Sequence, residues 1–166
     1  MSFHRTITFG RFNISHSGHI ELIQKMLEHG RIAHVYLSTS AKNNDLDTRI
    51  LMLKHLCREA NVDLARVKFS GAANVFDAVE ETLETALYLE CAVVFGTDQQ
   101  KMAEKLSAEF GVAHELNTRS TSSTEMRFFL DQERFTEDLK NLYNGDEFAI
   151  TLARILRAEE LQREKH

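Results

Sequence analysis

The chain has 166 residues, of which 43% are hydrophobic and 27% charged, and its formal net charge is −5 at pH 7. This length suits a single domain, which we place at residues 1–166, that folds without a disulfide or a metal. The acidic balance excludes a protein that wraps nucleic acid by charge, and the longest apolar runs are far too short to span a bilayer. We therefore expect a soluble protein whose partners include neither nucleic acid nor a membrane.

The two cysteines and the first residues bear on the compartment in which the protein works. Cys57 and Cys91 fall in helix-like and strand-like settings, which predicts buried thiols in a reducing compartment. The segment from Met1 to Gly10 is too polar and too short for a secretory signal peptide. The sequence therefore predicts a cytoplasmic protein, in the host cytoplasm if a phage encodes it.

Short apolar runs alternate with stretches of helical periodicity along the chain. We expect strands at residues 4–9, 33–37, 67–69, 91–95 and 112–116. We expect helices between them at 17–29, 47–60, 75–89 and 99–110, and further helices at 123–130, 134–143 and 147 to about 165. Gly30 and Gly111 directly follow two of these helices, in the place where glycine commonly ends a helix.

This alternation is typical of an α/β protein. Right-handed crossovers between successive strands produce a parallel five-stranded sheet with helices on both faces. The sequence therefore predicts a Rossmann-like fold with a C-terminal helical extension over about residues 123–166. Ligands of such folds bind at the carboxyl ends of the strands, near the point where the strand order reverses.

The segment from Gly10 to His19 follows the first expected strand and opens the first helix. A glycine-containing turn in that position offers the amides of a helix N-terminus to an anion. His16 and His19 flank Gly18 where phosphate oxygens would arrive, and Arg11 lies in the same turn. The segment therefore predicts a phosphate-binding turn.

A second polar cluster follows the fifth expected strand. Ser122, Ser123 and Thr124 lead into a helix that carries Arg127 about one turn later. Hydroxyl groups at the start of a helix, followed by a guanidinium, suit a second anion. Two such sites in one small domain indicate a nucleoside triphosphate that is held from both sides.

These two segments match two known motifs. The motif G-x-F-(D/N)-P-x-H-x-G-H is met at Gly10, Phe12, Asn13, His16, Gly18 and His19. The motif I-S-S-T-x-x-R is met at Ser122, Ser123, Thr124 and Arg127. With both motifs in this order, the chain resembles the nucleotidylyltransferases of the cytidylyltransferase-like group over nearly its whole length. It departs from them at Ile14, where proline usually stands, and at Thr121, where isoleucine does.

Two further elements extend the resemblance. Gly96, Thr97 and Asp98 match a G-x-D element after the fourth strand, and Lys42 falls where many members carry a phosphate-binding lysine. The resemblance implies that the catalytic residues are His16, His19, Lys42 and Arg127. It implies nucleotide-binding roles for Gly10, Arg11, Phe12, Asn13, Gly18, Asp98, Ser122, Ser123 and Thr124.

The implied activity is transfer of an NMP group, AMP from ATP in preference to CMP from CTP, to a small phosphorylated acceptor with release of pyrophosphate. A phosphate nucleophile is already ionised near neutral pH, so the site needs donors and cations rather than a general base. Mg²⁺ would arrive bound to the triphosphate, without a metal site in the protein. The acceptor could be nicotinamide mononucleotide, phosphopantetheine or a sugar or polyol phosphate, and the sequence is compatible with a homo-oligomer.

Each of these residues also has a structural alternative. Ser122 to Thr124 could cap a helix, and so could Asp98. Lys42 could be a solvated loop residue, and Arg127 a surface cation.

The histidines and the whole protein have alternatives as well. His16 and His19 could bind a metal, although no third ligand is evident. His34, His55 and His114 show no partner pattern and are expected to be structural. The alternative function is a non-catalytic nucleotide-binding regulator or virion component that keeps the fold.

Overall fold

The structure is a computed structural model, and it describes residues 3–118, 123–131 and 137–165. The strands are β1 (Phe3–Gly10), β2 (Gly30–Ser38), β3 (Val67–Ala72), β4 (Cys91–Gly96) and β5 (Ala113–Asn117). The helices are α1 (Ser17–His29), α2 (Leu46–Glu59), α3 (Val75–Leu83), α4 (Gln100–Phe110), α5 (Ser123–Leu130), α6 (Glu137–Leu142) and α7 (Glu147–Glu164). Short 3₁₀ turns lie at Leu64–Arg66, Tyr88–Glu90 and Thr97–Gln99.

The five strands form one parallel sheet in the order β3-β2-β1-β4-β5. Central β1 pairs with β2 from Phe3 opposite Gly30 to Gly10 opposite Leu37. The chain leaves β1 toward β2 and β3 and then crosses to the other side of β1 to form β4, so the strand order reverses between β1 and β4. The predicted Rossmann-like fold is confirmed, and the point of reversal lies where β1 ends, at the start of the predicted phosphate-binding turn.

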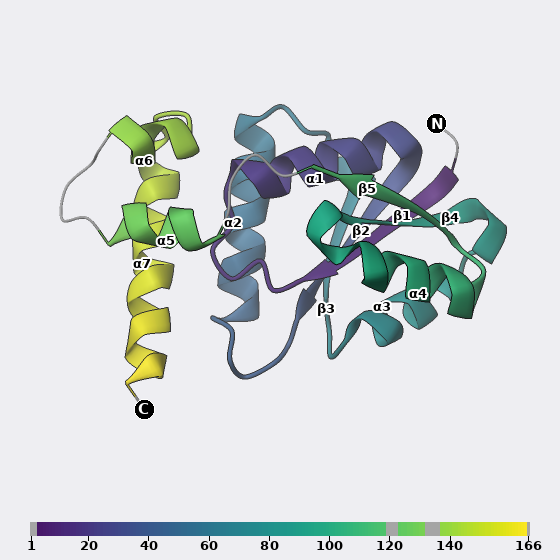
Figure 1. The fold of residues 1–166 in the computed structure, drawn as a ribbon. Coiled ribbons are helices and arrows are strands. Elements are labelled where there is room, and N and C mark those ends of the chain that lie inside the picture. The colour runs from purple at the N-terminus through teal and green to yellow at the C-terminus, as the bar shows by residue number, and fades with distance from the viewer. Residues whose placement is uncertain (1–2, 119–122, 132–136, 166) are drawn as a thin grey trace.

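Helices cover both faces of the sheet (Figure 1). Helices α1, α2 and the C-terminal helices share one core with the sheet, around buried side chains that include Ile23, Leu53 and Met126. Helices α3 and α4 pack on the other face around Val79 and Leu106. In Figure 1, α7 stands beside α2 with α5 next to it, so the C-terminal helices extend the helical layer that begins with α1 and α2.

Polar side chains and glycine set where several helices begin and end. Asp45, Asn74 and Asp146 cap α2, α3 and α7, because each side chain accepts a hydrogen bond from a backbone amide of the first turn. Helix α4 ends before Gly111, whose φ of +72° is a left-handed conformation that glycine adopts without strain. No helix in the described part of the chain is long and apolar enough to cross a membrane.

The expected helix at 75–89 is wrong in its second half, because α3 ends at Leu83. The Thr82 hydroxyl donates to the Ala78 carbonyl, and the Thr85 amide then donates to the Thr82 carbonyl in a turn. Leu87 and Leu89 beyond that turn are 67% and 74% exposed, so a longer helix would bury little against the sheet. The other expected strands and helices are confirmed to within a few residues at their ends, although 134–136 lie outside the described residues.

Candidate active site

The turn between β1 and α1 is shaped by Gly10 and Phe12. Phe12 is buried, at 5% exposure, and its φ of +43° lies in the left-handed region that L residues seldom adopt. A Cβ on Gly10 would stand 3.0 Å from the Cε2 atom of Phe12, so the glycine makes room for the ring. The Phe12 ring packs in turn on His19, with 5.1 Å between the ring centroids, and so helps to position that histidine.

His16 and His19 cap the start of α1 with their own rings. Nδ1 of His16 accepts a hydrogen bond from the Gly18 amide, and Nδ1 of His19 accepts one from the His16 amide, each at 3.1 Å. The two ring centroids lie 4.2 Å apart. Because Nδ1 is the acceptor in both rings, a neutral ring carries its proton on Nε2 and presents Nε2–H as its donor. The cap thus selects the tautomer in which Nε2 is the donor. His19 lines the inner cavity, whereas His16 is 1% exposed and lines neither the inner nor the outer cavity.

Two backbone amides at the start of α1 are already engaged in this cap. The Gly18 amide donates to the His16 ring, and the His19 amide donates to the His16 carbonyl at 3.0 Å. Anion binding by the turn therefore depends on side-chain donors more than the sequence pattern alone suggests.

Side chains from distant parts of the chain hold the turn in place. The Asn13 Oδ1 atom accepts a hydrogen bond from the Asn44 amide at 2.7 Å. The Tyr143 hydroxyl donates to the Ser15 carbonyl at 2.9 Å. Ile14, which replaces the usual proline, is buried in the core that α1 and α2 share with the sheet. Packing and hydrogen bonds therefore supply the order that a fixed proline φ would supply.

The Glu160 carboxylate of α7 forms hydrogen bonds with several polar side chains of the site. Its carboxylate accepts hydrogen bonds from Nε of Arg127 at 2.6 Å and from Nη2 of Arg127 at 2.9 Å, and further ones from Asn13 and Arg157. Burial raises the pKa of the Glu160 carboxyl, but the hydrogen bonds and the charge of Arg127, with the hydrogen bonds of Asn13 and Arg157, lower it to about 2. Glu160 is therefore ionised at neutral pH and holds the Arg127 guanidinium in one orientation.

Arg49 ties three loops of the site together, and the sequence predicts no role for it. It is 2% exposed, and its guanidinium donates to the backbone carbonyls of Arg11, Ser38 and Asn44 at 2.7–2.9 Å. A buried arginine on backbone carbonyls leaves no local pattern in a sequence, because one of these partners lies 38 residues away. Asn44 and Glu160 are missed from the sequence for the same reason.

Two cavities adjoin these residues. The inner cavity has a volume of about 220 Å³ and is lined by residues 8–14, by His19 and Leu22 of α1, and by Gln99 and Arg127. The outer cavity has a volume of about 910 Å³ and is lined by Arg11, Ala41, Lys42, Arg127, and by Glu159, Glu160, Gln162, Arg163 and Glu164 of α7. Because Arg11 and Arg127 line both, the two cavities meet at these arginines.

Most of the predicted site residues lie at these cavities. The predicted residues that line the inner cavity are Gly10, Arg11, Phe12, Asn13, His19 and Arg127. Lys42 lines the outer cavity, and His16 and Gly18 lie in the cap of α1. Thus Arg127 of the second motif lines the same cavity as residues of the first motif, although the two motifs are about 110 residues apart in the sequence.

The remaining predicted residues lie after β4 and around α5. Asp98 is exposed in the 3₁₀ turn after β4, and the N-cap position of α4 is Gln99, one residue further on. Ser123 and Thr124 occupy the first turn of α5, and their side chains are not described. Ser122 and Thr121 lie outside the described residues.

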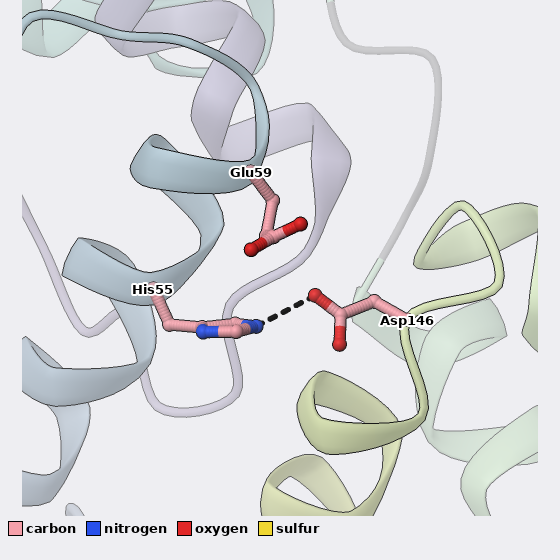
Figure 2. Close-up of side chains that lie close together, drawn as sticks. All are labelled: His55, Glu59 and Asp146. Atoms are coloured by element: carbon pink, nitrogen blue, oxygen red, sulfur yellow. Dashed lines mark hydrogen bonds and ion pairs between the residues drawn. The ribbon is translucent and has the colours of Figure 1, made fainter.

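A separate cluster has side chains of the kinds that bind metals (Figure 2). His55 and Glu59 project from successive turns of α2 toward Asp146 at the start of α7, and their ligand atoms lie within 4.8 Å of one another. His55 Nε2 and Asp146 Oδ2 are 2.6 Å apart and form an ion pair when the histidine is protonated. None of the three lines the inner or the outer cavity, so the cluster joins α2 to α7 away from the candidate site.

The cysteines and two other histidines also lie away from the cavities. Cys57 and Cys91 are buried free thiols, as predicted, and burial raises the pKa of Cys57 to about 12. His34 interacts with Arg5, and His114 is hydrogen-bonded to Ser107. These contacts fit the structural roles expected for both histidines.

A known protein family matches most of the chain. The family described as Cytidylyltransferase-like matches residues 7–139, which is well over half of the chain. The chain therefore belongs to the cytidylyltransferase-like family, and the fold and the family place it in the class of the nucleotidyltransferases. The match ends before α7, so Glu160 and Arg163 lie outside it. No curated protein sequence matches the chain.

Several solved structures share the fold. A bifunctional NMN adenylyltransferase/ADP ribose pyrophosphatase from Francisella tularensis gives a TM-score of 0.67 at 17% identity, over 96% of this chain and 54% of that chain. A structure of the same name, complexed with AMP and a Mn ion, gives 0.67 at 16% identity, over 96% and 53%. A Plasmodium falciparum nicotinic acid mononucleotide adenylyltransferase complexed with APC gives 0.68 at 14% identity, over 90% and 94%. The chain spans about half the length of the Francisella protein, and at these identities the likeness is one of fold.

Proposed function

We propose that the protein transfers an AMP group from ATP to a small phosphorylated acceptor and releases pyrophosphate. The observation that carries this proposal is that Arg11, His19 and Arg127 line one cavity at the point where the strand order reverses. Membership of the cytidylyltransferase-like family supports the type of reaction. The structures named as NMN and nicotinic acid mononucleotide adenylyltransferases support ATP as the donor and a pyridine mononucleotide as the first acceptor to test.

The proposed reaction is an in-line displacement at the α-phosphorus of ATP. An oxygen of the acceptor phosphate forms a bond to that phosphorus, and the bond to the oxygen that bridges to the β-phosphate breaks. Pyrophosphate leaves with the electron pair. Because the attacking phosphate is already ionised, the protein contributes orientation and charge stabilisation rather than a general base.

The two histidines and Arg127 carry the charge stabilisation in this proposal. The Nε2–H groups of His16 and His19 donate to the α- and β-phosphates as negative charge develops on the bridging oxygen. Arg127 neutralises the β- and γ-phosphates. Mg²⁺ bound to the triphosphate would reduce the repulsion between the triphosphate and the acceptor.

The other predicted residues have supporting roles. Lys42 steadies the acceptor phosphate, Asp98 contacts the ribose, and Arg11 acts where the two cavities meet. The turn is shaped by Gly10, Phe12, Asn13 and Gly18, and the β- and γ-phosphates are held by Ser122, Ser123 and Thr124.

We also propose that residues 1–166 act as one domain, with 123–166 as its helical tail. Helix α7 supplies Glu160 to Asn13 and Arg127, and its Leu156 carbonyl accepts a hydrogen bond from Asn44 Nδ2 at 3.1 Å. The tail therefore forms part of the site instead of a separate unit.

Pyrophosphate release with a panel of nucleotides and acceptors tests the proposed function. The panel pairs ATP, CTP, GTP and UTP with nicotinamide mononucleotide, nicotinic acid mononucleotide, phosphopantetheine and glycerol 3-phosphate, each in the presence of Mg²⁺. We expect release with ATP and a phosphorylated acceptor, and none with the dephosphorylated acceptor, which lacks the nucleophile. Binding of ATP without pyrophosphate release from any pair would contradict the proposal and favour the non-catalytic alternative.

A further inference from the structure

The outer cavity brings together cations from three separate parts of the chain. Arg11 comes from the turn after β1, Lys42 from the loop after β2, and Arg163 from the last turns of α7. In the described part of the chain, none of these three is ion-paired with a carboxylate. Instead, Nε of Arg11 donates to the neutral amide oxygen of Asn43 at 2.7 Å. Their charges are therefore not balanced by ion pairs.

Among these three cations, Arg163 most clearly lacks a full set of hydrogen-bond acceptors in the part of the chain that the structure describes. Its Nη1 atom donates to Oδ1 of Asn44, whereas its Nη2 atom is buried and has no hydrogen-bond partner among the described residues. A buried guanidinium nitrogen without an acceptor is unfavourable, because it has lost water without gaining a partner. Because Arg163 lines the outer cavity, a small movement of its side chain would let an anion there supply that acceptor.

Repulsion between neighbouring arginine side chains also favours an anion in the outer cavity. Burial lowers the pKa of Arg49, and the positive charges of Arg11 and Arg163 lower it further, although Asp45 opposes them. The guanidinium groups of Arg11 and Arg163 are therefore each close enough to that of Arg49 to repel it, and a phosphate dianion near them would relieve that repulsion.

The carboxylates on the same wall do not balance these cations. Glu160 already accepts hydrogen bonds from Asn13, Arg127 and Arg157. Glu159 and Glu164 are exposed, and no ion pair joins either of them to a described residue. Two exposed carboxylates therefore face three cations, of which Arg11 and Lys42 are also exposed, and one positive charge is left over.

We propose that Arg163, together with Lys42 and Arg11, binds the phosphate of a phosphomonoester acceptor in the outer cavity. This inference rests on the proposed function, because it locates the acceptor of that reaction in the outer cavity. Arg163 lines the outer cavity and not the inner one, whereas Arg11 and Arg127 line both. A phosphate at Arg163 thus lies on the side from which an acceptor approaches a triphosphate held by His19 and Arg127.

The charge of the reactants explains why such a site is needed. A phosphomonoester dianion has to approach a triphosphate, and cations that line the approach reduce the repulsion between the two anions. Arg163 lies beyond residues 7–139, so the family match does not specify it. Acceptor recognition is therefore carried in part by the C-terminal helix of this chain.

Calorimetric titration without ATP tests the inference, with nicotinamide mononucleotide and nicotinamide riboside as a phosphorylated and dephosphorylated pair. We expect Arg163→Gln to weaken binding of the mononucleotide about tenfold or more, and to leave binding of the riboside and of ATP within about twofold. Arg163→Lys should restore part of the affinity, and inorganic phosphate should compete with the mononucleotide in the wild type. Lys165→Gln removes an exposed cation from the same end of α7 and should leave all three affinities unchanged.

Three results would overturn the inference: equal losses for the mononucleotide and the riboside, no loss for either, or a loss for ATP of the same size. Failure here is distinct from failure of the proposed function. If pyrophosphate is released and Arg163→Gln leaves the KM for the acceptor unchanged, the phosphate site alone is overturned. If binding of the mononucleotide depends on Arg163 but no pair releases pyrophosphate, the phosphate site is supported and the proposed reaction is contradicted.

Discussion

The guanidinium of Arg127 faces two anions in the proposed enzyme. Glu160 accepts hydrogen bonds from Nε and Nη2 of Arg127, and the triphosphate is proposed to bind the same group. A guanidinium has five N–H donors, so two hydrogen bonds to a carboxylate are compatible with further ones to phosphate. Glu160 thus acts as a positioning residue, which orients Arg127 before the nucleotide arrives.

This arrangement gives a prediction at Arg127. Arg127→Gln should weaken ATP binding about tenfold or more and AMP binding much less, because AMP lacks the β- and γ-phosphates. Calorimetry with the two nucleotides measures both affinities. Equal losses for ATP and AMP would mean that Arg127 does not bind the β- and γ-phosphates.

Arg157→Gln is the matched control for that experiment. Arg157 also donates to Glu160, but it lines neither cavity. Because Glu160 keeps both of its hydrogen bonds to Arg127 in this variant, the replacement should not select between ATP and AMP. A preferential loss of ATP binding in this control would assign the effect to Glu160 rather than to Arg127.

His34 gives a prediction about pH and stability. Burial, with the nearby charge of Arg5, lowers the pKa of His34 from 6.5 to about 4 in the folded protein. Between these pH values the unfolded chain binds more protons than the folded one, so stability is complete above about pH 6.5 and falls as the pH drops toward 4. We expect the free energy of unfolding to fall by up to about 3 kcal/mol over this range, since one pKa unit corresponds to about 1.4 kcal/mol.

Urea unfolding at a series of pH values measures this loss. His34→Gln should flatten the dependence between pH 6.5 and 4.5, because an amide oxygen can still accept from Arg5 but does not titrate. In His114→Gln, which replaces an exposed histidine, the loss should persist. An unchanged slope in His34→Gln would contradict the account.

The sequence predicts some residues of the candidate site and misses others for a physical reason. His16, His19 and Arg127 belong to short motifs, so their types and spacing are visible along the chain. Glu160 is not visible in this way, because it meets Asn13 across 147 residues, and its burial is set by how α7 packs. Hydrogen-bond partners that meet only after folding leave no local spacing to detect.

At the scale of elements, strands and helices with a clear hydrophobic period are predicted well. Helix α1 begins and ends at the expected residues, and β4 continues its apolar run by one residue. Helix α3 is shorter than its apolar spacing predicts, because the chain turns at Thr85 and the leucines beyond that turn are exposed. Periodicity shows where a helix is favourable, whereas its end depends on what remains to be buried.

His55 and Asp146 are in contact at the junction of α2 and α7. Asp146 caps α7 through Oδ1, which accepts from the Ala149 amide, while its Oδ2 atom is paired with His55 (Figure 2). Both oxygens of this half-buried carboxylate therefore have partners. His55 holds Asp146 in the geometry that α7 needs in order to begin.

Removal of this contact should loosen α7. We expect His55→Ala to lower the free energy of unfolding by about 1–2 kcal/mol, which shifts Tm by a few degrees in a chain of this length. Thermal unfolding followed by circular dichroism measures the change. Glu59→Gln alters the same cluster without removing an interaction of the described residues, and should change stability by less than about 0.5 kcal/mol. Equal effects of the two variants would contradict the role of the His55–Asp146 pair.

At the scale of the whole molecule, the sheet and the C-terminal helices together make the candidate site. The sheet places the turn after β1 at the point of strand reversal, and α7 closes the outer cavity with Arg163 and positions Arg127 through Glu160. The sequence predicts the first part, because alternating strands and helices imply a parallel sheet. It does not predict the second, because the packing of α7 beside α2 follows from long-range burial.

We propose that the turn from Gly10 to His19 catalyses transfer of a nucleotidyl group. The most direct measurement follows the label of [α-³²P]ATP and, in parallel, of [γ-³²P]ATP with nicotinamide mononucleotide as acceptor. We predict that the α label appears in the dinucleotide product and the γ label in pyrophosphate. His19→Ala, folded by circular dichroism, should reduce product formation about a hundredfold or more, because it removes a donor aimed at the developing charge. Wild-type turnover in His19→Ala, or the γ label in the acceptor product, would contradict the account.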